Sequence, residues 1–80
     1  MMTREAYILI DAEKGRAPDV VIELTDKPGI LAAKEIWGPH DVIAVVEADN
    51  IDTLIHIVKN EIVAADGVIR TDTCLVITGH

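Results

Sequence analysis

The chain has 80 residues, a formal net charge of −7 and a composition that is 50% hydrophobic but only 2% aromatic. A chain of this length makes one small domain, residues 1–80, whose isolated core is close to marginal, so a partner subunit would add stability. The negative charge argues against nucleic-acid binding, because contacts to phosphates need clustered Lys and Arg. No apolar run approaches the roughly 18 residues of a membrane span and no signal peptide is evident, so we expect a cytoplasmic protein.

The start of the chain predicts a strand followed by a helix. Residues 6–12, AYILIDA, form an apolar run of strand length. Apolar residues then recur at i, i+3, i+4 and i+7 from Ala17 to Leu24, which predicts a helix within residues 16–27 with Pro18 in its first turn. The Val-Val-Ile run inside this segment is β-branched and locally favours a strand instead.

The middle of the chain predicts a hairpin. Residues 30–37, ILAAKEIW, indicate a second strand that ends at Trp37, and residues 41–48, DVIAVVEA, indicate a third. The intervening GPH is a tight reversal, so we expect the two strands to be antiparallel, with Gly38 and Pro39 at the tip of the hairpin.

The last third of the chain predicts a helix and a final strand. Asp49 or Asn50 is the expected N-cap, and Gly67 follows the end of the helix. The apolar positions of this helix are Ile51, Leu54, Ile55, Val58 and Ile62. Residues 68–78, VIRTDTCLVIT, alternate as a strand, with Thr71 and Thr73 on one side and Cys74 on the other.

The resulting order, βαββαβ, is the split βαβ arrangement of ferredoxin-like folds. Its right-handed crossovers place both helices on one face of a four-stranded antiparallel sheet, which makes the fold class α+β. The opposite face receives no helix. Both sides of residues 6–10 and 42–46 are nevertheless apolar, whereas a sheet that meets water on one side alternates apolar with polar residues. We therefore expect a homodimer packed sheet to sheet; the alternative is a monomer whose loops cover this face.

Three segments carry the resemblance to a known family. The hairpin WGPHD, residues 37–41, is similar to its Gly-x-aromatic-Asp turn; DGVIRTDTCLVI, residues 66–77, is similar to its Gly-Val-x-x-Thr-x-Thr strand; and AYILIDAEKG, residues 6–15, looks like its first strand. The chain resembles the regulation-of-amino-acid-metabolism (RAM) domain, the ligand-binding and oligomerising half of Lrp/AsnC transcriptional regulators. His40 departs from the pattern, since a Tyr is most often found there.

The resemblance implies a non-catalytic domain that needs no cofactor and binds amino acids or similar small effectors. It also implies dimers that assemble into a ring, such as an octamer or decamer. Family members usually carry a helix-turn-helix domain, for which this sequence has no counterpart. The chain therefore looks like a stand-alone form that does not bind DNA directly and acts as a sensor or co-assembles with a full-length regulator.

A hairpin and a strand supply candidate ligand-binding residues. An amino acid needs a carboxylate or carbonyls for its ammonium and N–H or hydroxyl donors for its carboxylate. Asp41 is the candidate for the ammonium, Gly38 allows the backbone to approach the ligand, and His40 can stack on it or hydrogen-bond to it. Thr71 and Thr73 offer hydroxyls from one face of the last strand. Alternatively, these are ordinary turn and strand residues.

Other chemistry has little support in the sequence. The histidines at positions 40, 56 and 80 lack a short metal-ligand spacing, and we expect no metal site. The single Cys74 cannot form an internal disulfide and is expected to be a buried thiol. Neither a Gly-rich phosphate loop nor a GxSxG elbow is present. Two alternative functions remain: a small dimeric isomerase or monooxygenase with His40 as its base, and a structural adaptor without a ligand.

Overall fold

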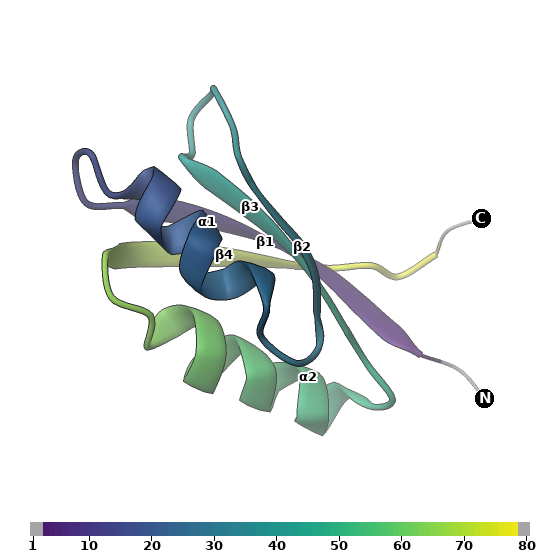
Figure 1. The fold of residues 1–80 in the computed structure, drawn as a ribbon. Helices are drawn as coiled ribbons and strands as arrows, with labels where there is room; N and C mark the ends of the chain where they lie inside the picture. The colour runs from purple at the N-terminus through teal and green to yellow at the C-terminus, as the bar shows by residue number, and fades with distance from the viewer. Residues whose placement is uncertain (1–2, 79–80) are drawn as a thin grey trace.

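The computed structural model describes residues 3–78 as a layer of helices packed on a layer of strands (Figure 1). Both helical segments lie on the same face of the sheet. The elements in chain order are β1 (Arg4–Ala12), α1 (Ala17–Thr25), β2 (Ile30–Glu35), β3 (Val42–Ala48), α2 (Ile51–Ile57), the π-helix η1 (Val58–Val63) and β4 (Val68–Leu75). This order confirms the predicted ferredoxin-like βαββαβ fold.

The sheet has the strand order β2-β3-β1-β4, and every neighbouring pair is antiparallel. β1 is therefore central: Ile8 pairs with Ala44 of β3 on one side and with Thr73 of β4 on the other. Strands β2 and β4 are the edges of the sheet. Because β1 and β3 lie in the middle, the side chains that point away from the helices form a continuous strip along two adjacent strands.

The predicted reversal between β2 and β3 is confirmed, but β2 is shorter than expected and the loop begins earlier. β2 ends at Glu35, which pairs with Val42, rather than at Trp37. The backbone N–H of Ile36 donates to the carbonyl of Asp41 at 2.9 Å and closes the loop. Trp37 thus belongs to the loop, where no neighbouring strand continues the ladder.

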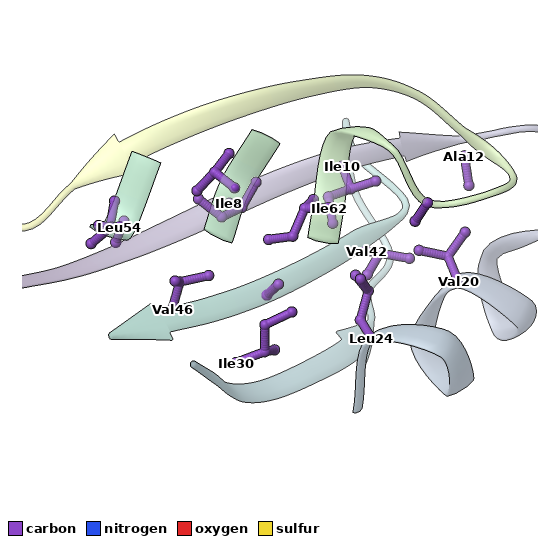
Figure 2. Packing of buried hydrophobic residues seen from close by; sticks show 14 of the residues in the cluster. Ile8, Ile10, Ala12, Val20, Leu24, Ile30, Val42, Val46, Leu54 and Ile62 are labelled. Atoms are coloured by element: carbon purple, nitrogen blue, oxygen red, sulfur yellow. The ribbon is translucent and has the colours of Figure 1, made fainter. Parts of the chain in front are cut away.

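The core is aliphatic and lies between the sheet and the helices, as Figure 2 shows. Alternation along β1 and β3 turns one set of side chains inward, while Leu24 of α1 and Ile62 of η1 meet them from the helix layer. Each fully buried Ile or Leu contributes about 1.5–3 kcal/mol. The fully buried large side chains are Ile8, Ile10, Leu24, Leu54, Ile62, Val20, Val42 and Val46.

Helix α1 forms despite its β-branched run, which confirms the prediction from its spacing. Val20 and Leu24 are fully buried, whereas Ile22 on the opposite side is 73% exposed. β-Branched residues lower helix stability by only a few tenths of a kcal/mol each relative to better helix formers. The burial of two core side chains outweighs that local preference, because each contributes several times as much.

The second helical segment starts and stops where the sequence indicates. The side chain of Asn50 accepts a hydrogen bond from the backbone N–H of Thr53 at 2.8 Å, so Asn50 is the cap. Gly67 follows the segment with a φ of 92°, and its carbonyl accepts a hydrogen bond from Glu13. Within residues 3–78, neither helical segment is long and apolar enough to cross a membrane.

The π-helical turn η1 was not predicted. Leu54, Val58 and Ile62 are buried at intervals of four residues. In an α-helix each residue turns about 100°, so a row with this interval drifts about 40° per step around the axis. The wider π turn keeps the row on the core. Ile55 lies outside the row and is 46% exposed, although its spacing placed it on the apolar face.

The face of the sheet away from the helices is open in this chain. Tyr7 is 41% exposed there, and Leu9, Ile43 and Val45 are half-buried. The alternation predicted for β1 and β3 is confirmed, since both faces carry apolar side chains. Cys74 pairs with Tyr7 on this face and is exposed, so the prediction of a buried thiol was wrong: its side of the edge strand β4 faces away from the helices.

Candidate functional site

The base of the β2–β3 hairpin is fixed to the end of β1 through Asp41. The backbone N–H of Asp41 donates to the carbonyl of Ile10 at 2.9 Å, and one carboxylate oxygen, Oδ2, accepts a hydrogen bond from the backbone N–H of Ala12 at 2.9 Å. The carboxylate therefore takes the place of a strand partner for Ala12, at the point where the β1–β3 ladder has ended. The other oxygen, Oδ1, is not needed for that bond.

His40 lies beside Asp11 of β1, 29 residues earlier in the chain. Its Nδ1 is 2.9 Å from Asp11 Oδ1, and the two side chains are only 19% and 22% exposed. Arg70 Nη2 donates to the second Asp11 oxygen at 3.1 Å, and His40 Nε2 lies 3.7 Å from Asp72 Oδ2. We call Asp11, His40, Arg70 and Asp72 the outer-face cluster, because cross-strand pairing places Arg70 beside Asp11 on the side away from the helices.

The electrostatics of the outer-face cluster favour an ionised Asp11. The hydrogen bond from His40 lowers the pKa of Asp11 below its ordinary value of 3.8, while burial acts in the opposite direction and Arg70 lowers the pKa further. An ionised carboxylate only accepts hydrogen bonds, so the Nδ1 of His40 carries the proton. The imidazole is thus fixed in one tautomer by a carboxylate, which leaves Nε2 for a second partner.

The predicted site residues fall into two groups in space. Gly38 is at the exposed tip of the hairpin, while His40 and Asp41 meet the end of β1. Thr71 and Thr73 pair with inward-facing residues of β1 and therefore lie on the helix side of β4. Within one chain, His40 and Asp41 and the two threonines lie on opposite faces of the sheet. A single small ligand therefore cannot contact both groups in the same chain.

Three members of the outer-face cluster were missed by sequence reasoning. Asp11, Arg70 and Asp72 were treated as ordinary strand residues, since no sequence spacing links Asp11 to Arg70, 59 residues later. Alternation along the last strand puts Arg70 and Asp72 on the same side as Cys74, opposite the threonines. Finding the cluster required the register between β1 and β4, which the alternation of a single strand cannot supply.

Metal chemistry has no geometric basis among residues 3–78, where no group of three His, Cys, Asp or Glu side chains could hold a metal ion. His56 is exposed on α2, and Asn60 Nδ2 lies 2.8 Å from its Nδ1. His80, the third histidine, lies outside the described residues.

The fold, with an open sheet face and a polar cluster beside the hairpin, defines a ferredoxin-like α+β domain. A family model described as the Lrp/AsnC ligand binding domain matches residues 5–79, almost the whole chain. The chain belongs to this family of ligand-binding domains found in transcriptional regulators, as the RAM-domain resemblance predicted. No curated protein matches the sequence significantly.

Solved structures show the same fold. TTHA0845 from Thermus thermophilus is 25% identical, with a TM-score of 0.89, and the match covers 96% of each chain. AsnC from E. coli is 22% identical with a TM-score of 0.87 over 95% of this chain and 52% of AsnC, so the likeness spans about half of that regulator. The transcriptional regulator NMB0573 from Neisseria meningitidis, solved with L-Met, is 17% identical with a TM-score of 0.81 over 94% of this chain and 50% of that one. The last two similarities concern the fold.

Proposed function

We propose that this chain is a non-catalytic sensing and oligomerisation domain whose effector is an amino acid or a similarly small molecule. The observation that carries the proposal is the match of the Lrp/AsnC ligand binding domain to residues 5–79. NMB0573, which shares the fold, was solved with L-Met. The effector would bias a transcriptional regulator of amino-acid metabolism, either through this chain alone or through its co-assembly with a full-length regulator.

The chemistry beside the hairpin suits a zwitterion. Arg70 is 72% exposed and can bind a carboxylate through two parallel N–H groups. Asp72 is 58% exposed and can accept hydrogen bonds from an ammonium group. Both side chains belong to β4, two residues apart on the same face, within the outer-face cluster. The two side chains thus offer one partner for each charged end of a free amino acid.

The proposed ligand-binding residues follow the hairpin. Asp41 would use its free Oδ1 toward the ligand ammonium, His40 would contact the ligand beside Asp11, and Gly38 would allow close approach of the backbone. Thr71 and Thr73 would donate hydrogen bonds to a ligand that lies against the helix side of β4. A neighbouring subunit would help to enclose that ligand.

Oligomerisation is the second half of the proposal. The outward side chains Tyr7, Leu9, Ile43 and Val45 form an apolar strip on the open sheet face. A second copy that packs its own strip on this face would exclude water from both, which favours a homodimer. Dimers would then assemble into a higher ring, with effector sites between them.

Calorimetric titration with each proteinogenic amino acid, combined with light scattering, tests the proposal. We expect heat of binding from one amino acid or a chemically related few, with a dimer or larger species by light scattering. Binding heat from none of them would contradict the sensor and leave the structural adaptor. A monomer at every concentration would contradict the oligomerisation domain.

One observation favours a second candidate, a small dimeric enzyme. An imidazole whose Nδ1 is held 2.9 Å from a carboxylate, as His40 is beside Asp11, is the usual arrangement of a general base. Here the other nitrogen faces Asp72 at 3.7 Å, so a substrate would have to displace that contact. An effector pocket within one dimer would support the enzyme, and a pocket between dimers would support the sensor.

A further inference from the structure

His40 Nε2 and the carboxylate of Asp72 face each other as two hydrogen-bond acceptors. The Nδ1 of His40 carries the ring proton toward Asp11 at 2.9 Å, so Nε2 offers only a lone pair. That lone pair lies 3.7 Å from Asp72 Oδ2, and an ionised carboxylate likewise only accepts hydrogen bonds. A ligand group with several N–H donors, such as an ammonium, can serve both acceptors, whereas a hydroxyl has a single hydrogen to donate.

Asp41 offers a second acceptor beside this pair. Its Oδ2 accepts the backbone N–H of Ala12 at 2.9 Å, whereas its Oδ1 has no hydrogen-bond partner among residues 3–78. His40 precedes Asp41 in the hairpin and Asp11 precedes Ala12 in β1, so the two contacts between hairpin and strand are consecutive. The Asp41 carboxylate therefore borders the outer-face cluster.

Arg70 is the cation of this cluster and can bind only part of its negative charge. Asp11, Asp41 and Asp72 carry three formal negative charges against the one positive charge of Arg70, which leaves an excess of two while the imidazole is neutral. Asp11 is bonded to both His40 and Arg70, so the excess falls on Asp41 and Asp72. With 72% of its side chain exposed, Arg70 keeps further N–H groups for a ligand.

A ligand with two positive groups and one negative group complements these charges. A neutral amino acid brings one ammonium and one carboxylate, and it leaves one of the two protein carboxylates without a partner. A second basic group on the ligand supplies that partner, whereas an acidic side chain would add to the negative excess. The net charge of −7 acts in the same direction, because it attracts cations over a longer range.

We infer that the effector is a basic amino acid that places one cationic group between His40 and Asp72, the other at Asp41, and its carboxylate on Arg70. The inference rests on the proposed function, which derives from the match to a ligand-binding domain, and it assigns the charge class of the effector.

Calorimetric titration with matched ligands tests the charge class in the unmodified protein. L-Lysine should bind at least about fivefold more tightly than L-norleucine, whose side chain lacks only the terminal ammonium, because a charged contact at a partly exposed site contributes a factor of that order. Cadaverine, which is lysine without its carboxylate, should also bind less tightly, since it makes no use of Arg70.

The outcomes separate this inference from the proposed function. If norleucine or another neutral amino acid binds as tightly as lysine, the charge class is wrong and the amino-acid sensor stands. If cadaverine binds as tightly as lysine, the role of Arg70 and the amino-acid class are both wrong. Binding heat from no proteinogenic amino acid would overturn the inference together with the proposed function.

Variants provide the second test, with circular dichroism to confirm that each is folded. Asp72→Asn should reduce the preference for lysine over norleucine to nearly one, because a single free carboxylate, that of Asp41, then remains for one ammonium. Asp52→Asn is the matched control: it changes the net charge equally, but Asp52 is exposed in the first turn of α2, in the helix layer. An unchanged preference in Asp72→Asn, or an equal loss in Asp52→Asn, would overturn the inference.

Discussion

Asp41 has a structural role in the hairpin and a proposed role in the ligand site, and two substitutions separate them. Asp41→Asn keeps a side-chain oxygen that can accept the hydrogen bond from Ala12, now 2.9 Å long, but removes the negative charge. Asp41→Ala removes both. The asparagine variant should therefore fold nearly as well as the parent while binding an amino-acid ammonium less tightly.

The size of each effect follows from the bond that is lost. A hydrogen bond to a charged group contributes about 1.5–3 kcal/mol and a neutral one about 0.5–1.5 kcal/mol. We therefore expect Asp41→Ala to lower the free energy of unfolding by about 1.5–3 kcal/mol and Asp41→Asn by about 1 kcal/mol. Effector affinity should fall several-fold in both, because each lacks the charge that we propose faces the ligand ammonium.

Urea unfolding and calorimetric titration measure the two effects separately. Unfolding must be compared at one protein concentration, since dimerisation contributes to stability by mass action. Glu23→Ala, which removes an exposed carboxylate from α1, controls for the change in net charge. Equal stability of the Ala and Asn variants would refute the anchoring role. Parental effector affinity in both would remove Asp41 from the site.

Two further predictions concern backbone conformation and charge. Gly15→Ala should destabilise the protein by about 1–2 kcal/mol in the same urea titration, because its φ is 79° although the space around it is open. Gly29→Ala should cost this amount for its φ of 83° and a smaller further amount, because Ile57 Cδ1, 2.5 Å from the new Cβ, must move. His40→Ala should raise the pKa of Asp11 measured by NMR, because the hydrogen bond from His40 lowers it. The stability from Asp11 is present above pH 3.8 and is lost as the pH falls through its lowered folded pKa. Equal losses in the two glycine variants, or an unchanged pKa, would contradict the respective reasoning.

The fold could be predicted because its burial is periodic. Inward residues of β1 such as Ile8 and Ile10 alternate with Tyr7 and Leu9, and alternation alone assigns their faces. Helix α1 was predicted against the local preference of its β-branched run because spacing reports burial, which outweighs propensity. The turn η1 could not be predicted in this way, since hydrophobic spacing does not reveal which carbonyl each N–H bonds to.

The candidate site depended on register, which one strand does not contain. His40 and Asp11 are 29 residues apart and meet only because the hairpin closes onto the end of β1. The alternation of β4 grouped Thr71 with Thr73, yet it did not say that this group faces the helices. The same uncertainty produced the wrong prediction for Cys74, since an apolar neighbourhood in sequence was taken as burial in space. A strand at the edge of a sheet can bury little on a face that no helix covers.

The two halves of the proposed function, effector binding and dimerisation, would be linked if the hairpin takes part in both. If the proposed effector binds at His40 and Asp41 and strengthens the proposed dimer by a given factor, it must itself bind the dimer more tightly by that factor. Apparent effector affinity should therefore change with protein concentration across the dimer transition. An affinity that is the same in monomer and dimer would show that the hairpin does not couple the two events.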